Sequence, residues 1–151
     1  MEEKKFHTYN FISINDKELY GCLELDLLSL GGIWSLNQWH EELTANNRFC
    51  FGLKIDKKLI ALVVALKTLD ELEILFLGVL PEFRNKKIGF ELINYLFYEA
   101  KLKNFTKATL EVKQSNLVAK RFYKKYGFKR FGVRKKYYKD GTDAILYEIK
   151  I

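Results

Sequence analysis

The segment over residues 74–103 constrains the fold more than any other part of this chain. Residues 73–80 are nearly all apolar, which indicates a strand covered on both faces, and Pro81, the only proline, ends that strand. Apolar side chains then recur every four positions from Ile88 to Ala100, which predicts a helix of about four turns. A strand that passes through a short loop into a helix is typical of mixed α/β proteins.

The rest of the chain continues this alternation of helical and extended segments. In chain order we expect helices over 15–30 and 36–45, a hairpin of strands over 49–55 and 59–67, the strand over 73–80, the helix over 88–103, a strand over 106–112, a helix over 115–126 and a hairpin of strands over 128–139 and 144–151. This order predicts one α/β (α+β) domain over residues 1–151, with a mixed central sheet and helices on both faces.

Local signals mark the ends of three of these helices. The Gly31-Gly32 pair stops the first helix, Ser35 is the expected cap of the second, and Gly127 stands where the helix over 115–126 requires a left-handed residue. The expected core-facing stripes of the first and of this last helix are Leu19, Leu23, Leu27 and Leu30, and Val118, Phe122 and Tyr126.

Charge is distributed unevenly along the chain. Residues 1–100 hold 11 Lys+Arg and 15 Asp+Glu, a net of −4, whereas residues 101–151 hold 15 and 4, a net of +11. This basic block either attracts phosphates, nucleic acid or an acidic partner, or is a solvated surface. Because the chain lacks zinc-finger, RNP-like and GXXG motifs, we expect no direct nucleic-acid function.

Cysteine usage and hydropathy indicate a cytoplasmic protein. Cys22 and Cys50 form no C-x-x-C pair, so we expect two buried small hydrophobic residues and neither a disulfide scaffold nor a zinc site. His7 and His40 have no partner pattern, and no metal is implied. No apolar run reaches the roughly 18 residues of a membrane span, and the first six residues lack the apolar region of a signal peptide.

The loop before the helix over 88–103 carries the features of an anion site. Arg84, Lys86 and Lys87 immediately precede the helix N-terminus, whose N–H groups are unpaired and partly positive. Gly89 in the first turn allows a ligand to approach the backbone closely. The pattern predicts a cradle for a pyrophosphate, with an ordinary basic connection as the alternative, and it matches neither the P-loop nor the Rossmann fingerprint.

The loop before this helix and several later motifs resemble those of a known protein family. Arg84-x-x-Lys87-x-Gly89 resembles the acetyl-CoA signature of the GNAT acetyltransferases, which implies the GNAT fold with a mostly antiparallel sheet. Further motifs over about residues 30–151 are similar to those of the ribosomal-protein-alanine N-acetyltransferases: WS at 34–35, LEVKQSN at 110–116, FYKKYGF at 122–128, RKKYY at 134–138 and DA at 143–144. The resemblance implies transfer of acetyl from acetyl-CoA to the N-terminal amine of a protein.

The resemblance also implies which residues contact acetyl-CoA. They are Leu77, Val79, Arg84, Asn85, Lys86, Lys87, Ile88, Gly89, Phe90 and Asn116. Simple helix capping is the alternative role for Asn116. Lys87 stands where the family has a glycine, so its side chain either crowds the phosphate or points to solvent while its N–H binds. Backbone N–H groups of 77–79, at a bulge that Gly78 permits, are the expected oxyanion donors.

The same resemblance assigns the chemistry to two side chains. Glu111 is the implied general base and Tyr123 the implied acid that protonates the leaving thiolate; a solvent-facing carboxylate and a packed helix aromatic are the alternatives. An N-terminal amine is neutral in roughly one molecule in seven at pH 7, against roughly one in 2,500 for a lysine, so it requires only modest help from a base. Trp34, Tyr137 and Tyr138 are the expected walls of the peptide slot; the two tyrosines alternate in a strand, so only one faces the cleft.

Three functions are compatible with these residues. The first is N-terminal acetylation, most specifically of the N-terminal alanine of a small-subunit ribosomal protein. The second is acetylation of a small-molecule amine on the same scaffold. The third is a ribosome- or RNA-binding module with a vestigial acetyl-CoA site, and the presence of both Glu111 and Tyr123 argues against it.

Overall fold

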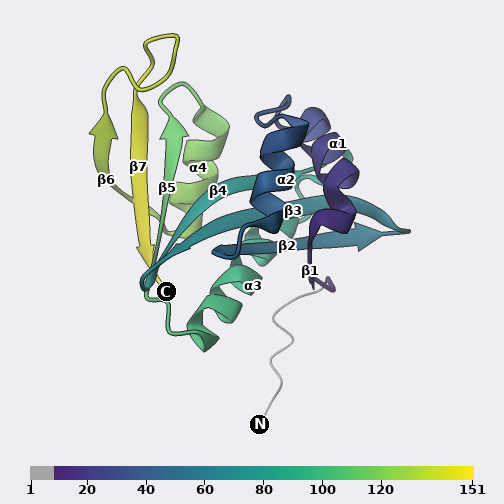
Figure 1. The fold of residues 1–151 in the computed structure, drawn as a ribbon. Helices are drawn as coiled ribbons and strands as arrows, with labels where there is room; N and C mark the ends of the chain where they lie inside the picture. The colour runs from purple at the N-terminus through teal and green to yellow at the C-terminus, as the bar shows by residue number, and fades with distance from the viewer. Residues whose placement is uncertain (1–8) are drawn as a thin grey trace.

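The computed structural model describes residues 9–151, so His7 and the expectation about the first six residues lie outside the described part. The elements in chain order are β1 (Ile12–Ser13), a short 3₁₀ helix (Asp16–Glu18), α1 (Leu19–Ser29), α2 (Leu36–Thr44), β2 (Arg48–Ile55), β3 (Lys58–Thr68), β4 (Glu71–Val79), a second 3₁₀ helix (Pro81–Phe83), α3 (Ile88–Leu102), β5 (Lys107–Lys113), α4 (Leu117–Tyr126), β6 (Lys129–Arg134) and β7 (Ala144–Lys150) (Figure 1). The predicted order of elements is confirmed.

A seven-stranded sheet with the order β1-β2-β3-β4-β5-β7-β6 organises the fold. The β4–β5 pair is parallel and the other neighbouring strands are antiparallel, so the expected mixed, mostly antiparallel sheet is confirmed. Helices α1 and α2 pack on one face, and α3 packs on the other with α4 beside it (Figure 1). The aromatic contacts of Tyr126 with Phe90 and Phe97 join α4 to α3.

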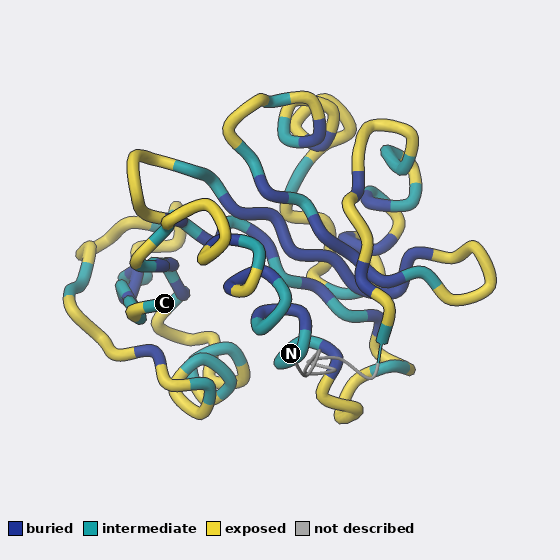
Figure 2. Tube along the Cα trace, turned by 90° about the horizontal axis from the view of Figure 1, so that it is seen from below, coloured by how far each residue is buried: buried dark blue, intermediate teal, exposed yellow. Residues whose placement is uncertain are grey.

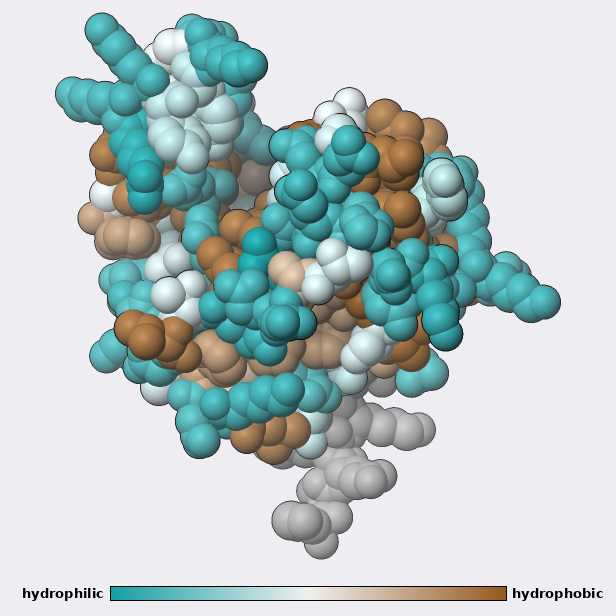
Figure 3. All heavy atoms as spheres, in the orientation of Figure 1, coloured by the Kyte–Doolittle hydropathy of each residue, from teal (hydrophilic) through white to brown (hydrophobic). Residues whose placement is uncertain are grey.

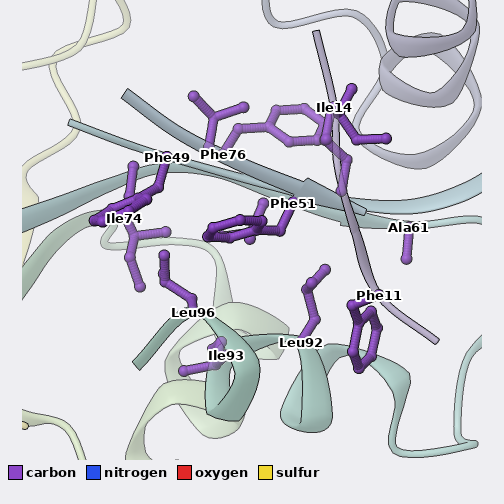
Figure 4. Close-up of a cluster of buried hydrophobic side chains, with 14 of the residues drawn as sticks. Phe11, Ile14, Phe49, Phe51, Ala61, Ile74, Phe76, Leu92, Ile93 and Leu96 are labelled. Atoms are coloured by element: carbon purple, nitrogen blue, oxygen red, sulfur yellow. The ribbon is translucent and has the colours of Figure 1, made fainter. Parts of the chain in front are cut away.

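The core lies on both faces of the central strands (Figure 2). Seven consecutive residues of β3, from Leu59 to Ala65, are buried, because this strand has helices on both sides. On the α3 side, Phe49 and Phe51 of β2 stack and meet Leu92 and Leu96 (Figure 4). Burial of this apolar surface against α3 provides the main driving force for closing that layer.

Strand β4 departs from the expectation of a strand covered on both faces. After the exposed Glu71, its residues alternate between buried and half-buried positions. Leu75, Leu77 and Val79 occupy half-buried positions because β4 loses its neighbour β5 beyond Glu73. The near-continuous apolar run therefore reflects a partly open edge as well as core packing.

The expected apolar stripes of α1 and α4 are only partly correct. Leu27 and Leu30 are 56% and 43% exposed, and the buried residues of α1 are Cys22, Leu25 and Asp26. Leucines lie on most sides of α1, so spacing alone did not select its core face. In α4, Val118 is 79% exposed because the N-terminal turn of this helix extends beyond the core.

The predicted helix ends are confirmed in detail. Ser35 and Gln38 form a reciprocal capping box at the start of α2. Gly127 has φ +122 and follows α4, and its N–H donates to the carbonyls of Tyr123 and Lys124. Phe128 is buried directly after it, as the hydrophobic contact of this type of helix end requires.

The last hairpin is shorter than expected. Strand β6 ends at Arg134, and residues 135–143 form a loop in which the Lys136 N–H donates to the Asp143 carboxylate at 2.8 Å. Tyr137 and Tyr138 therefore lie in this loop and not in a strand, so the argument from strand alternation was wrong. Their rings contact each other with centroids 5.1 Å apart.

The remaining expectations concern cysteines, metals and membranes. Cys22 and Cys50 are free thiols, buried and half-buried respectively, and burial raises the pKa of each to about 12. Residues 9–151 contain no group of three His, Cys, Asp or Glu side chains arranged to hold a metal ion. No helix within the same range is long and apolar enough to cross a membrane.

Candidate active site

The centre of the molecule opens where β4 and β5 separate. These parallel strands pair only from Glu71 to Glu73 with Lys107 to Thr109, and beyond that point each loses the other as a neighbour. Figure 3 shows the surface hollowed between the part that carries β5, β6 and β7 and the part that carries α1 and α2. Backbone groups along this edge of β4 lack a strand partner, so they are available to a bound ligand.

The bulge in β4 lies closer to the start of the strand than expected. The register with β3 shifts between Ile74 and Phe76, which places the extra residue at Leu75 and not in 77–79. Gly78 has a different role. A Cβ at Gly78 would meet Ser29 Oγ at 2.8 Å and the Phe76 ring at 2.9 Å, so glycine is required for the end of α1 to pack closely on β4.

The loop between β4 and α3 presents backbone N–H groups to the opening. Asn85 and Lys87 both adopt left-handed conformations, with φ of 61 and 60. Lys87 precedes α3 without a side-chain capping bond, so the first N–H groups of this helix remain unpaired. This concave backbone beside a helix N-terminus fits a diphosphate group.

Lys87 adopts a backbone conformation that glycine accepts at no steric cost. A left-handed residue with a side chain costs roughly 1–2 kcal/mol relative to glycine. The Lys87 side chain is exposed, which agrees with the alternative in which it points to solvent. The direction of the Lys87 backbone N–H is set by the left-handed φ of this residue and not by its side chain. That this N–H contacts a phosphate stays a prediction.

The two other basic residues of the loop have structural partners. Arg84 donates from Nη2 to the Ser29 carbonyl at 2.8 Å and from Nε to the Val79 carbonyl at 3.3 Å. Its guanidinium therefore joins the end of α1 to the end of β4, and its side chain is not a free anion ligand. Lys86 lies with Nζ 5.5 Å from the centre of the Phe83 ring, and its carbonyl accepts from the Tyr9 hydroxyl at 3.2 Å.

The first turn of α3 packs against the neighbouring elements. The Ile88 side chain is buried, so only its backbone is available to a ligand. A Cβ at Gly89 would lie 3.5 Å from the Phe122 ring and 3.7 Å from Val79, which is ordinary contact, so the fold alone does not require glycine there. The Phe90 ring packs on Tyr126 with centroids 4.6 Å apart.

Asn116 serves as the cap of α4. Its Oδ1 accepts from the Ala119 N–H at 3.1 Å, which is the alternative role that the sequence left open. The side-chain amide N–H₂ is not used by this cap. A contact of that group with acetyl-CoA stays a prediction.

A group of charged side chains lies where the two strands part. Leu110 and Val112 are buried, so Glu111 points from β5 to the opposite face, as predicted. There its Oε1 lies 3.1 Å from Nε of Arg134, on β6. Glu73 on β4 faces the same way, because it is the register partner of Thr109. Burial raises the pKa of Glu73 above its ordinary value, and the charge of Glu111 raises it further.

Tyr123 lies on α4 in an aromatic environment. Its ring contacts those of Phe122 and Phe128, with centroids 5.2 Å and 5.4 Å away. Burial raises the pKa of the Tyr123 phenol well above its ordinary value, so the hydroxyl stays protonated at neutral pH. Across the described residues 9–151 this hydroxyl has no hydrogen-bond partner, and its role as a proton donor stays a prediction.

Aromatic residues line the two sides of the opening. Trp34 packs against Trp39 and Phe76, with centroids 4.7 Å and 5.6 Å apart. On the other side, Nζ of Lys113 on β5 lies 5.5 Å from the centre of the Tyr138 ring, and burial and then the charge of Glu111 raise the pKa of this phenol. Tyr137 is more exposed and stacks under the Arg134 guanidinium at 5.7 Å. Tyr138 is therefore the better placed of the two tyrosines.

Asp26 is a residue of this region that sequence reasoning missed. It is fully buried, and its carboxylate accepts from the N–H groups of Ile33 (2.9 Å) and Trp34 (3.0 Å) and from the indole N–H of Trp39 (3.0 Å). These bonds fix the loop after α1, in which Gly31 and Gly32 have positive φ. The available signal was a second carboxylate, after Glu24, near the end of a mostly apolar helix and just before a Gly-Gly pair.

Comparison with known proteins agrees with this geometry. The model of the acetyltransferase (GNAT) family matches residues 12–128. A putative [ribosomal protein bS18]-alanine N-acetyltransferase of Bacillus subtilis is 30% identical over 131 residues, which cover 85% of this chain and 86% of that protein.

Solved structures show the same fold. The ribosomal-protein-S18-alanine N-acetyltransferase of Escherichia coli superposes with a TM-score of 0.85 at 24% identity, covering 94% of this chain and 93% of the other. The PaiA N-acetyltransferase of Thermoplasma acidophilum, solved with coenzyme A, gives a TM-score of 0.81 at 23% identity, covering 96% and 100%.

Proposed function

The chain belongs to the acetyltransferase (GNAT) family and is an acyltransferase, and from that premise we propose that it transfers acetyl from acetyl-CoA to the N-terminal amine of a protein. The observation that carries the proposal is the position of Glu111 on the open face at the vertex between β4 and β5, beside the aromatic residues Tyr138 and Tyr137. A carboxylate beside an aromatic slot suits an extended peptide that presents one amine.

Acetyl-CoA would lie along the separated edge of β4. The unpaired backbone beyond Glu73 offers hydrogen bonds to the pantetheine chain and to the thioester oxygen, and the loop before α3 offers N–H groups to the pyrophosphate. Leu77 and Val79, which are half-buried on this edge, supply apolar contact. Lys86 and Lys87 add positive charge near the phosphates.

The acetyl transfer requires a neutral amine and a protonated leaving group. Glu111 accepts a proton from the substrate ammonium, directly or through a water, and the amine lone pair attacks the thioester carbonyl carbon. The C–N bond forms, the C–S bond breaks, and the thiolate takes a proton from the Tyr123 hydroxyl. A thiol, with an ordinary pKa of about 8.5, is a stronger acid than this phenol, so the Tyr123 hydroxyl first stabilises the departing thiolate by a hydrogen bond, and the proton that it gives up must be replaced from the protons that the nitrogen loses.

The substrate that we propose is a protein beginning with alanine, and specifically a small-subunit ribosomal protein. Support comes from the similarity to the putative [ribosomal protein bS18]-alanine N-acetyltransferase of Bacillus subtilis, over 85% of this chain, and from the sequence motifs that resemble those of such enzymes. A cytoplasmic location would follow from such a substrate. The alternative of a non-enzymatic binding module loses its basis, because the family is one of acyltransferases.

Thiol release from acetyl-CoA tests this proposal. Two hexapeptides of equal charge are compared, one with a free N-terminal alanine and one with a blocked N-terminus and an internal lysine. We expect rapid release with the first peptide and release close to the blank with the second. Release with neither peptide but with a small primary amine would replace N-terminal acetylation by small-molecule acetylation.

A further inference from the structure

The half-buried carboxylate of Glu73 has no role in the mechanism described above. It lies at the last position where β4 pairs with β5, just before the two strands separate. Among the residues that the structure describes, no hydrogen bond or ion pair engages the Glu73 carboxylate, whereas Glu111 is held by Arg134 at 3.1 Å. Partial burial of a carboxylate without a hydrogen-bond or ion-pair partner costs free energy, so the presence of Glu73 beside the proposed reaction centre requires an explanation.

Register places the two carboxylates together. Glu73 is level with Thr109, and Glu111 is two residues further along β5, so both side chains leave the same face of the sheet as diagonal neighbours. Their electrostatic coupling agrees with this placement, because the charge of Glu111 raises the pKa of Glu73. Arg134 on β6 and Arg48 on β2 act in the opposite direction, and Arg48 is itself paired with Glu42 of α2.

We infer that Glu73 is a second catalytic carboxylate, which binds the substrate ammonium together with Glu111 and accepts one of the two protons that the nitrogen loses. This inference rests on the proposed acetyl transfer. Between ammonium and amide the nitrogen loses one proton before it attacks and a second when the tetrahedral adduct collapses. Glu111 and Glu73 take these two protons, and Tyr123 gives its own proton to the thiol. One of the two carboxylate protons then restores the Tyr123 hydroxyl by way of water and the other is released to solvent, so the reaction balances.

Glu111 and Glu73 lie in different environments, which suit them to different steps of the proton transfer. The Nε atom of Arg134 lies 3.1 Å from Oε1 of Glu111 and holds this carboxylate in place, so Glu111 is suited to orient the ammonium and accept its first proton. Glu73 has no cation in contact, and burial raises its pKa above the ordinary value, so it is suited to receive the second proton. Two carboxylates in different environments are a recurring arrangement for proton transfer.

Glu73→Gln tests the inference, with Glu71→Gln as the matched control. Glu71 lies two residues away on the same strand but is exposed and paired with Lys107 at 3.2 Å. The kcat and KM are measured from pH 6 to 9 with the alanine peptide and with a small primary amine. We expect Glu73→Gln to lower kcat/KM at least tenfold with whichever acceptor the wild-type enzyme uses, at unchanged acetyl-CoA affinity, and Glu71→Gln to stay within twofold.

Thermal unfolding separates this loss from misfolding. A carboxylate whose folded pKa is raised destabilises the protein once the pH rises through that pKa, so Glu73→Gln should have a Tm at pH 7 equal to or above that of the wild type, and the difference should shrink as the pH falls. Wild-type kcat/KM in the Glu73→Gln variant overturns the inference while leaving the proposed function intact. If the wild-type enzyme acetylates only the small amine, the proposed N-terminal substrate is wrong, and the effect of Glu73→Gln is then measured with that amine. If the wild-type enzyme acetylates neither acceptor, both the proposed function and the role of Glu73 are overturned.

Discussion

The Nε atom of Arg134 lies 3.1 Å from the Oε1 atom of Glu111, so a cation from β6 holds the carboxylate that we assign as general base. This ion pair crosses β7, which lies between β5 and β6 in the sheet. The position of the base therefore depends on the last hairpin of the chain.

Replacing Glu111 with glutamine should lower kcat at pH 7 by about 100-fold, because the amide cannot accept the ammonium proton. Acetyl-CoA affinity, measured by calorimetry, should stay within twofold. Glu148→Gln is the control, since Glu148 lies on neighbouring β7 and pairs with Lys107 at 3.4 Å. Equal turnover in Glu111→Gln and the wild type would remove Glu111 from the base role.

Replacing Arg134 with methionine should move the acidic limb of the pH–rate profile to higher pH. Arg134 lowers the proton affinity of Glu73, so its removal raises the pKa of Glu73 further and leaves less ionised carboxylate at a given pH. Arg130→Met on the same strand, exposed and without a carboxylate partner among residues 9–151, is the control. A profile that superposes on the wild type would mean that Arg134 acts only on the stability of β6.

Replacing Tyr123 with phenylalanine should lower kcat at least tenfold, because the leaving thiolate loses its proton donor. The Tm should not fall, since this hydroxyl has no partner to lose among the described residues. Tyr126→Phe is the matched control on the same helix. It removes a hydrogen bond to Asn94, so it should lower the Tm and leave kcat unchanged. A lower Tm together with an unchanged kcat in Tyr123→Phe would mean that Tyr123 contributes only to packing.

Replacing Asp26 with alanine should cost about 3 kcal/mol, because the buried indole N–H of Trp39 and two partly buried backbone N–H groups lose their acceptor. In a chain of this length that loss lowers the Tm by about 6–12 °C. Because Trp34 is then no longer fixed, the KM for peptide should rise. Glu24→Ala, at an exposed position of α1, should change the Tm little. Similar Tm values for the two variants would contradict the role of Asp26 as an anchor.

Replacing Gly89 with alanine should separate cofactor binding from folding. The added Cβ meets Phe122 and Val79 at ordinary contact distances, and alanine favours a helix, so the Tm should stay level or rise. Acetyl-CoA affinity should fall, because the methyl group occupies the space that the phosphate approaches. Gly78→Ala should do the opposite and destabilise the fold, since its Cβ would lie 2.8 Å from Ser29 Oγ. Unchanged affinity in Gly89→Ala would place the phosphate elsewhere.

The fold could be predicted from sequence wherever local signals decide it. Ser35 begins α2 and Gly127 ends α4, each through hydrogen bonds to residues at most four positions away, and both helix ends are confirmed. The position of Asp26 could not be foreseen in the same way, because its partners Trp34 and Trp39 are 8 and 13 residues distant. The half-buried positions of β4 depend on the residue at which its pairing with β5 ends. The pairing of two strands that are distant in sequence cannot be predicted from the local pattern of either strand.

The candidate site could be predicted in part because its motifs come in a fixed order along the chain. The structure brings Glu111 and Tyr137 against the same guanidinium, that of Arg134, and gives Lys87 a left-handed conformation. It does not leave Arg84 free, because the end of α1 competes for its guanidinium. Glu73 escaped notice because a glutamate near the start of an apolar strand resembles any exposed strand end.

The location of the acetyl group on a peptide tests the central claim most directly. A single peptide that carries both a free N-terminal alanine and an internal lysine is incubated with acetyl-CoA and the full chain, and the product is sequenced by tandem mass spectrometry. The account predicts one acetyl group, on the alanine α-amine, and its disappearance with Glu111→Gln. An acetyl group on the lysine side chain, or an unmodified peptide beside an acetylated small amine, would contradict it.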